Sequence, residues 1–523
     1  MSMSVALVGY GETALGIVPN RSPLELTVDA TLAAIDNAGL ARKDIDGLIT
    51  CNSLVQPIMY HAEATAEYLG LRPRHCFTVG TGGGTTYTAI RYAAAAIAEG
   101  LASTVVVAMA DSMRSFMTRD QAMIVQASAG HPAYEQPYGP SVPAYYALIA
   151  RAHMAQFGTT EAQFAEAMVS SRAWAAMNPT AQYRELVTAD DVLASRPIAD
   201  PLKLLDCSIV SDGGGAVVLM SAERAADVCE KPIQLLGFGE GHAYEHVSQA
   251  QDLTTSAAVM SGQAAYEQAG IGPADVDLAQ LYDCFTPALL IQLEDLGFCE
   301  KGAGGQYLQS GITKPGGALP VNTHGGMLSH CHPGNPGAFF WTYRGDSSTL
   351  GSSWRAPTAE SSACIVACSG RYHVQPCHAN YWSEIMSEQR VSPTITPLTQ
   401  PYFDACNEGR LVIQQCDGCA RWQFYPRHVC SHCGGGDLLW KEAAGTGRVA
   451  SYTVVRRAIS KAYTAPYVIA LIDLDEGVRM MSQLREVDPD TVSVGQCVEV
   501  LFEQWVGEDS LPVFRPVKNV VGE

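Results

Sequence analysis

Residues 33–53 read AAIDNAGLARKDIDGLITCNS and residues 264–284 read AAYEQAGIGPADVDLAQLYDC, so the two segments align without a gap. Both hold an Ala-Ala pair, an Ala-Gly pair followed by Leu or Ile, and an Asp-Ile-Asp or Asp-Val-Asp turn. Upstream of them, VALVGYGE at residues 5–12 recurs as IQLLGFGE at residues 233–240. Each copy has the pattern of strand, helix, acidic turn and buried strand. This predicts a duplicated α/β unit over roughly the first 385 residues, with helices covering layered sheets.

The repeat relates two side chains that can carry chemistry. Cys51 and Tyr282 each lie five residues after an equivalent aspartate, Asp46 in the first copy and Asp277 in the second. We therefore expect Cys51 and Tyr282 at pseudo-symmetric positions, each near the end of a buried strand.

The composition limits the class of protein. A chain of 523 residues is too long for one ordinary core, and 47% hydrophobic against 16% charged residues is typical of well-buried globular domains. The net charge of −20 argues against a nucleic-acid partner, which would need a basic face. The start, MSMSVALVGYGETALG, has no signal-peptide features, and no apolar run is long enough for a membrane span. We expect a cytoplasmic protein whose 16 cysteines are thiols or metal ligands.

The residue composition changes several times along the chain, which indicates domain boundaries. Pro393, Pro397 and Pro401 interrupt a polar stretch, which predicts a linker before a C-terminal tail. The predicted division is an N-terminal half over residues 1–228, a C-terminal half over 229–386, the linker over 387–403, a zinc ribbon over 404–440 and a small barrel over 441–523.

The tail contains four cysteines with metal-ligand spacing. They follow the pattern C-x2-C-x10-C-x2-C, and paired knuckles of this kind place four thiolates tetrahedrally around zinc. The spacing favours this interpretation over four buried free cysteines. Because no further ligand is evident, we expect a closed, structural Zn²⁺ site rather than a catalytic one. The predicted ligands are Cys416, Cys419, Cys430 and Cys433.

Short β-rich runs with turns between them follow the cysteines. They are GRVASYTVVRRAI, PYVIALIDLDEG, VRMMSQLREV and QCVEVLFEQW. The pattern predicts a small five-stranded barrel. Such barrels often bind nucleic acid, but the acidic balance of the chain argues against that function here.

The segment FTVGTGGGTTYTAIRYAAAAIAEG, residues 77–100, has the pattern of a strand, a glycine-rich turn and an Ala-rich helix. It lacks the G-x-x-x-x-G-K-[ST] pattern, and Thr85 stands where a dinucleotide pattern would have its third glycine. A turn that leads into a helix can still present N–H groups to an anion. Three interpretations remain: a phosphate-binding loop, a tight turn for close packing, and a nucleophile loop that has lost its nucleophile.

The repeat, the YDCF motif at residues 282–285 and NTHGGMLSHCHPG at residues 322–334 together resemble the thiolase superfamily, closest to its sterol-carrier-protein-x branch. This resemblance implies a duplicated five-layer α-β-α-β-α fold, a homodimer and an acyl-CoA thioester as substrate. The tail resembles the zinc-ribbon/OB-fold domain that accompanies such enzymes.

The resemblance can be carried over one position at a time. In thiolases, a cysteine at the start of the helix after the glycine turn attacks the thioester. The register of the helix places that position at about Gly83, whereas Cys76 lies earlier, on the incoming strand, and is interpreted as a core thiol. The HDCF motif of one branch appears as YDCF, so Tyr282 replaces a histidine, and GHP appears as CHP, with His332 kept.

The altered motifs imply altered chemistry. Without a thiolate no acyl-enzyme forms, so ordinary thiolysis is not expected. The resemblance to thiolase-like steroid side-chain aldolases implies retro-aldol cleavage of a branched β-hydroxyacyl-CoA to a ketone and acetyl- or propionyl-CoA.

The roles implied for individual residues follow from that reaction. Tyr282 would be the acid/base, and His332 its partner or a donor to the thioester oxygen, with His330 and Cys284 as secondary candidates. Backbone N–H groups would stabilise the enolate oxygen. The candidate donors are Gly83, Gly84 and Gly326.

Two other functions stay open. A thiolase-type acyltransferase or condensing enzyme with Cys284 or Cys51 as nucleophile would form a covalent acyl adduct. A non-catalytic CoA-thioester-binding scaffold would bind without turnover. In each case the tail is expected to shape the acyl-CoA entrance, and an acyl-CoA hydratase is a candidate partner on the resemblance alone.

Other residues near these motifs also carry reactive groups. Cys331 lies between His330 and His332, but adjacent residues rarely chelate one ion, so a metal site there is not favoured. Cys368, in Cys-Ser-Gly, and Tyr372 resemble the second-cysteine loop of other thiolases.

Overall fold

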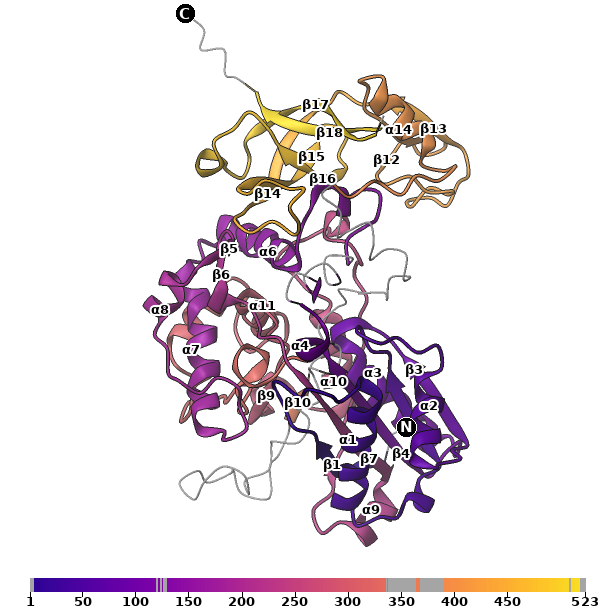
Figure 1. Ribbon diagram of the computed structural model, residues 1–523. Helices are drawn as coiled ribbons and strands as arrows, with labels where there is room; N and C mark the ends of the chain where they lie inside the picture. Colours follow the sequence, from indigo (N-terminus) through magenta and orange to yellow (C-terminus); the bar gives the residue numbers. More distant parts are fainter. Residues whose placement is uncertain are drawn as a thin grey trace, which may run out of the picture.

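The computed structural model describes residues 4–118, 121–122, 125, 129–334, 336, 364–366, 390–507 and 509–517. Both halves of the repeat form an α/β part, and the tail, drawn in orange and yellow, packs at one end of it (Figure 1). Among the helices of these residues, none has both the length and the apolar character that a bilayer crossing requires.

Five strands of the first half, together with β8 from the start of the second half, form a six-stranded mixed sheet with the order β3-β2-β4-β7-β1-β8. Strand β2 runs parallel to β3 and β4, whereas β7 is antiparallel to β4 and β1. Strand β3 therefore forms one edge of the sheet. The strands are β1 (Val5–Glu12), β2 (Gly47–Cys51), β3 (His75–Val79), β4 (Thr104–Ser112), β7 (Asp212–Ser221) and β8 (Ile233–Gln234).

Helices bury both faces of this sheet. Successive side chains of a strand point to opposite faces, so Val8 of β1 joins one apolar layer and Leu7 joins the other. Helices α1 (Pro23–Asn37) and α2 (His61–Leu69) cover the face of Val8, and α3 (Thr85–Ala98) covers the face of Leu7.

The duplication predicted from the sequence is confirmed by the same close approach of a glycine to the following helix in both halves. A Cβ atom at Gly9 would lie 2.6 Å from the carbonyl oxygen of Ala34 in α1. At the equivalent Gly237, a Cβ atom would lie 2.5 Å from the carbonyl oxygen of Ala265 in α10 (Ala258–Ala269). Only glycine allows the backbones to approach so closely, which is why both copies keep it.

The chain between β4 and β7 builds a separate layer of helices. Helix α7 packs against α11 of the second half and against the π-helical turn Gly326–His330. Figure 1 shows α7, α8 and α11 grouped on one side of the α/β part. The elements of this insertion are α4 (Met113–Phe116), α6 (Val142–Phe157), α7 (Glu161–Met177), α8 (Ala189–Ala194), β5 (Pro197–Ala199) and β6 (Leu202–Lys203).

The second half repeats the order of helix, turn and strand, and its strand β9 pairs in parallel with the later strand β10. A further helix, α9 (Ala222–Val228), connects the halves. The other elements are β9 (Leu278–Gln280), α11 (Thr286–Asp295), α12 (Gly304–Gln309) and β10 (Cys364–Val366).

The tail begins with a small sheet and ends in a barrel. The order β12-β11-β13 forms the sheet, and the pairings β14–β15–β16–β18–β17–β14 close five strands into a barrel, as the sequence predicted. The elements are α14 (Gln400–Asn407), β11 (Val412–Cys416), β12 (Trp422–Gln423), β13 (Leu438–Glu442), β14 (Thr446–Val455), β15 (Tyr467–Leu474), β16 (Arg479–Leu484), β17 (Cys497–Val506) and β18 (Asp509–Pro516).

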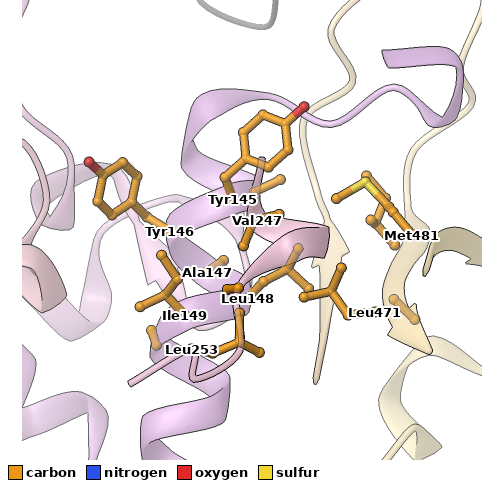
Figure 2. Packing of buried hydrophobic residues seen from close by; sticks show 14 of the residues in the cluster. Tyr145, Tyr146, Ala147, Leu148, Ile149, Val247, Leu253, Leu471 and Met481 are labelled. Atoms are coloured by element: carbon orange, nitrogen blue, oxygen red, sulfur yellow. The ribbon is translucent and has the colours of Figure 1, made fainter. Parts of the chain in front are cut away.

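The barrel and the α/β part share one apolar core. Leu148 of α6 belongs to the same buried cluster as Leu471 of β15 and Met481 of β16 (Figure 2). The hydroxyl of Ser451 donates to the carbonyl oxygen of Leu148 at 2.6 Å, and β14 pairs with β5. The tail is therefore built into the fold rather than attached to it by a linker alone.

Candidate active site

Tyr282 lies in the short connection between β9 and α11. Its backbone N–H donates to Oε1 of Gln292 at 3.2 Å, and its carbonyl oxygen accepts from Nε2 of the same side chain at 2.5 Å. Gln292 is itself buried in α11. The helix therefore fixes the backbone from which the phenol projects.

The phenol ring of Tyr282 lies directly against Gly83 in the glycine-rich turn. A Cβ atom at Gly83 would lie 2.5 Å from both Cε2 and Cζ of Tyr282 and 2.7 Å from its hydroxyl oxygen. Carbon atoms pack at about 3.5–4.0 Å, so no side chain fits between the two residues. The ring occupies the volume that a nucleophile at position 83 would need.

His332 lies beside the same phenol. The two rings meet edge to face, with their centroids 6.4 Å apart and an interplanar angle of 89°. Nδ1 of His332 is 2.8 Å from Oγ of Ser208, and its backbone N–H donates to Oγ of Ser211 at 3.1 Å. Burial lowers the pKa of His332 to about 4, so the imidazole is neutral near neutral pH. A neutral imidazole has one donor and one acceptor nitrogen, which suits a partner in proton transfer.

A cavity of ≈ 410 Å³ adjoins His332, whereas Tyr282 is not among the residues that line it. His332, Ser208 and Phe285 lie in its wall, and Phe285 follows Tyr282 by three residues. The rest of the wall is mostly apolar, an arrangement typical of pockets in which a few polar groups orient a ligand. Apolar lining residues include Met113, Met117, Met168, Leu204, Ile209 and Leu328.

The wall of the cavity also includes a buried arginine, Arg172, that the sequence patterns did not predict. Arg172 of α7 donates from Nε to Oγ of Ser329 at 3.1 Å and from Nη1 to the carbonyl oxygen of Glu185 at 2.9 Å. Its guanidinium also lies over the ring of Tyr183, 5.7 Å from the centroid. Burial lowers the pKa of Arg172 from its ordinary value. The only signal in the sequence was a lone arginine on an otherwise small and apolar helical face.

Neither cysteine considered as an alternative nucleophile is poised as a thiolate. Burial raises the pKa of Cys284 far above its ordinary value, and hydrogen bonds with Tyr146 and Tyr282 offset that rise only in part. Burial also raises the pKa of Cys51, and the nearby Asp111 raises it further. Thiols are nucleophilic as thiolates, so this environment opposes attack by either residue.

Asp283, next to Tyr282, anchors the π-helical turn. Its Oδ1 accepts from the backbone N–H of Met327 at 2.8 Å. A Cβ atom at Gly326 would lie 1.8 Å from Oδ2 of Asp283, and Gly326 has φ +62°. Burial raises the pKa of Asp283 to about 7. Close packing against Asp283 therefore explains why position 326 is glycine, independently of the role as enolate donor that was expected for it.

Of the predicted catalytic and oxyanion residues, His332 alone lies in the cavity wall, and two others are also set apart from the contact between Tyr282 and His332. His330 is fully buried, with Nε2 3.3 Å from Oγ1 of Thr180 and its ring edge to face with His324. It is not among the residues that line the cavity. Gly84 is buried at the junction between the turn Gly82–Gly84 and α3. The structure thus brings together Tyr282, His332 and Gly83. His330 lies apart from them, beside Thr180 and His324.

The four cysteines of the tail meet at one point. The Sγ atoms of Cys416 and Cys433 are 3.6 Å apart, as are those of Cys419 and Cys430, and all four lie within 4.8 Å of one another. Zinc–sulfur bonds of about 2.3 Å in a tetrahedron separate the sulfur atoms by about 3.8 Å. The donor set and its spacing therefore fit a tetrahedral zinc ion.

Two further predictions concern residues near the other motifs. Within the residues described, the tail cysteines are the one group placed to hold a metal, so Cys331 and its neighbours form no such cluster. Cys331 is buried, with its Sγ 3.9 Å from the carbonyl oxygen of Asp212. Cys368 and Tyr372 lie outside the described residues.

Comparison with known families matches most of the chain in four parts. Residues 5–223 match the thiolase N-terminal domain, and residues 239–343 match the thiolase C-terminal domain-like family. Residues 403–438 match the rubredoxin-like zinc ribbon domain of ChsH2, and residues 440–503 match the ChsH2 C-terminal OB-fold domain.

Individual proteins give the same picture. A steroid side-chain-cleaving aldolase of Thermomonospora curvata is 37% identical over 63% of this chain and 86% of its own. A 17-hydroxy-3-oxo-4-pregnene-20-carboxyl-CoA lyase of Mycobacterium tuberculosis is 36% identical over 64% of this chain and 88% of its own. The solved structure of an Ltp2–ChsH2(DUF35) aldolase is 36% identical, with a TM-score of 0.58 over 64% of this chain and 87% of that one. The chain therefore belongs to the thiolase superfamily and carries a ChsH2-type zinc ribbon and OB-fold on the same polypeptide.

Proposed function

We propose that this protein is a thiolase-like lyase that cleaves a branched β-hydroxyacyl-CoA, by a retro-aldol reaction, to a ketone and acetyl- or propionyl-CoA. The observation that carries the proposal is the contact between Gly83 and Tyr282. The position of the thiolase nucleophile has no side chain, and a phenol fills the space instead. A site without that nucleophile cannot form the acyl-enzyme there, whereas a phenol can exchange a proton with substrate.

The proposed reaction is balanced within the substrate. The hydroxyl on the β-carbon gives up its proton, and the bond between the α- and β-carbons breaks. Its electron pair passes into the thioester as an enolate, while the β-carbon leaves as a ketone. The α-carbon then takes up a proton to give the shorter acyl-CoA.

We assign roles in this reaction from the geometry. Tyr282 is the acid/base, and the neutral His332 is its partner or the donor to the thioester oxygen. The enolate is the costly intermediate, and each well-placed backbone N–H from Gly83 or Gly84 would stabilise it by about 3–4 kcal/mol. The arrangement needs no thiolate, in keeping with the raised pKa of Cys284.

The substrate class rests on the cavity and on the relatives. Two relatives are named for a steroid side chain and for a 17-hydroxy steroid CoA ester. We propose a substrate of the same kind, a CoA thioester with an apolar acyl group, and we assign the ≈ 410 Å³ cavity to part of it. The apolar wall would hold the ligand, and Ser208 with His332 would orient it.

Mass spectrometry of protein and products tests the proposal. The protein would be incubated with acetyl-CoA, propionyl-CoA and a series of tertiary β-hydroxyacyl-CoAs. Release of a ketone with acetyl- or propionyl-CoA, at unchanged protein mass, is the expected result. A stable acyl adduct on Cys284 or Cys51 would replace the lyase with an acyltransferase, and binding without turnover would leave a CoA-thioester scaffold.

The tail and the assembly complete the proposal. We propose one structural Zn²⁺ in residues 404–440, because the four Sγ atoms have tetrahedral spacing.

A cytoplasmic homodimer is proposed with β3 at its interface, since β3 is an open sheet edge on which Phe77 packs against Tyr92. An acyl-CoA hydratase that supplies the β-hydroxy substrate is the proposed further partner.

A further inference from the structure

We infer that Gly83 is a positioning residue for Tyr282, so that a side chain at position 83 and a working phenol at position 282 exclude each other. The inference rests on the proposed function, because it concerns how the acid/base of that reaction is held. It assigns to Gly83 a role distinct from donating its N–H group.

The backbone does not explain the glycine. Within the turn Gly82–Gly84, Gly82 has φ +61°, a conformation that other residues adopt only with strain. Gly83 has no such φ, so its backbone would accept alanine or cysteine. The reason for glycine at 83 must therefore lie in its surroundings.

The surroundings point to one side chain. The three heavy atoms nearest to a Cβ at Gly83 all belong to the ring of Tyr282, at 2.5, 2.5 and 2.7 Å. Two of them are ring carbons rather than the tip of a flexible chain. The ring is also confined, because Gln292 holds the backbone of Tyr282 and the imidazole of His332 meets its edge. A methyl group at 83 would therefore displace the phenol from its position beside His332.

The converse follows from the same distances. A cysteine at 83 places its own Cβ in that volume, so a thiol cannot be restored there while Tyr282 keeps its position. The absence of a side chain at 83 and the presence of tyrosine at 282 are thus sterically linked: each residue leaves room for the other. A single substitution at 83 would remove the lyase activity without creating an acyl-enzyme.

Gly83→Ala, made in the full-length protein, is the test, because alanine keeps the N–H group and adds only the clashing carbon. Gly80→Ala is the matched control, since a Cβ at Gly80 meets nothing within 4 Å. We expect Gly83→Ala to lower kcat by about 100-fold with a small change in KM, as for a displaced catalytic group, and to lower Tm by several degrees. Gly80→Ala is expected to change neither quantity.

A double-mutant cycle separates positioning from general damage. In a Tyr282→Ala background, Gly83→Ala should no longer lower Tm, because the clashing ring is gone. An equal fall in Tm in both backgrounds, or full kcat for Gly83→Ala, would overturn the inference. Full activity of Tyr282→Phe would instead overturn the acid/base assignment, while the coupling in Tm between positions 83 and 282 would stand.

Discussion

The imidazole of His332 and the phenol of Tyr282 meet at an interplanar angle of 89°, although His332 follows the π-helical turn Gly326–His330 and Tyr282 follows β9. Asp283 holds that turn through the backbone N–H of Met327. The residue next to the proposed acid/base therefore also positions the loop that carries its partner.

Removal of the Tyr282 hydroxyl should stop the chemistry and spare the fold. Tyr282→Phe keeps the ring against Gly83, so we expect kcat to fall by about 10²–10⁴ with little change in KM or Tm. Ketone release under steady-state conditions measures this. Tyr68→Phe, at a residue of α2 that is 66% exposed, is the control and should behave as wild type. Retention of full activity in Tyr282→Phe would refute the assignment.

The pH profile of cleavage should show no change in rate caused by titration of a histidine near pH 6.5. Burial lowers the pKa of His332 to about 4, so its imidazole stays neutral from pH 6 to pH 8. We expect a profile of kcat/KM without a pKa near 6.5 and a loss of activity in His332→Gln. A pKa near 6.5 in the wild-type profile that disappears in His332→Gln would contradict a neutral, partly buried His332.

Asp283→Asn should change how stability depends on pH. Burial raises the pKa of Asp283 to about 7, above about 4 in an unfolded chain. The contribution of this carboxyl to the free energy of unfolding is fully present below about pH 4. It is lost as the pH rises through 7. Asparagine keeps the acceptor oxygen without the charge. The stability of the variant relative to wild type should therefore rise between pH 4 and 7, by up to ~1.4 kcal/mol per pH unit.

Urea unfolding at several pH values measures this difference. Groups that are unchanged in both proteins, such as the buried Asp111 and Asp206, cancel in the comparison. A difference in free energy that is independent of pH would mean that the carboxyl of Asp283 titrates as it does in water.

Removal of the ribbon ligands should unfold the ribbon locally. Cys430→Ser is expected to lower the zinc content from about one ion per chain to near zero and to lower Tm, because structural zinc sites supply folding free energy. Cys497→Ser, at an exposed thiol in β17, is the matched control and should retain zinc. Elemental analysis with thermal unfolding checks both, and a zinc-replete Cys430→Ser protein would exclude the proposed ligand set.

Truncation after Pro401 should produce an insoluble α/β part. The barrel buries Leu148 and Val247 in a shared core, so its removal exposes apolar side chains and leaves the edge of β5 unpaired (Figure 2). A chain that ends at Val517 keeps every barrel strand and should remain soluble and active. Soluble, fully active truncated protein would show that the tail is dispensable.

Local patterns in the sequence were sufficient for much of the fold. The spacing of alanine, glycine and aspartate in residues 33–53 and 264–284 predicted the duplication, because a repeated packing contact requires the same small residues twice. The C-x2-C-x10-C-x2-C spacing predicted the cysteine cluster, because each pair of ligands is close in the chain. The absence of a nucleophile at Gly83 was also visible, since the glycine turn and its helix are contiguous.

Contacts between distant segments were decided only by the tertiary structure. That Tyr282 fills the space at Gly83 depends on how the two halves pack, and no pattern within either half encodes that distance. The same holds for Arg172 in the cavity and for the pairing of β14 with β5. The sequence by itself determined which reactive side chains the motifs offer and that position 83 has none. The packing of remote elements determined which of those groups meet, because side-chain neighbours across a core are set by the fold and not by spacing along the chain.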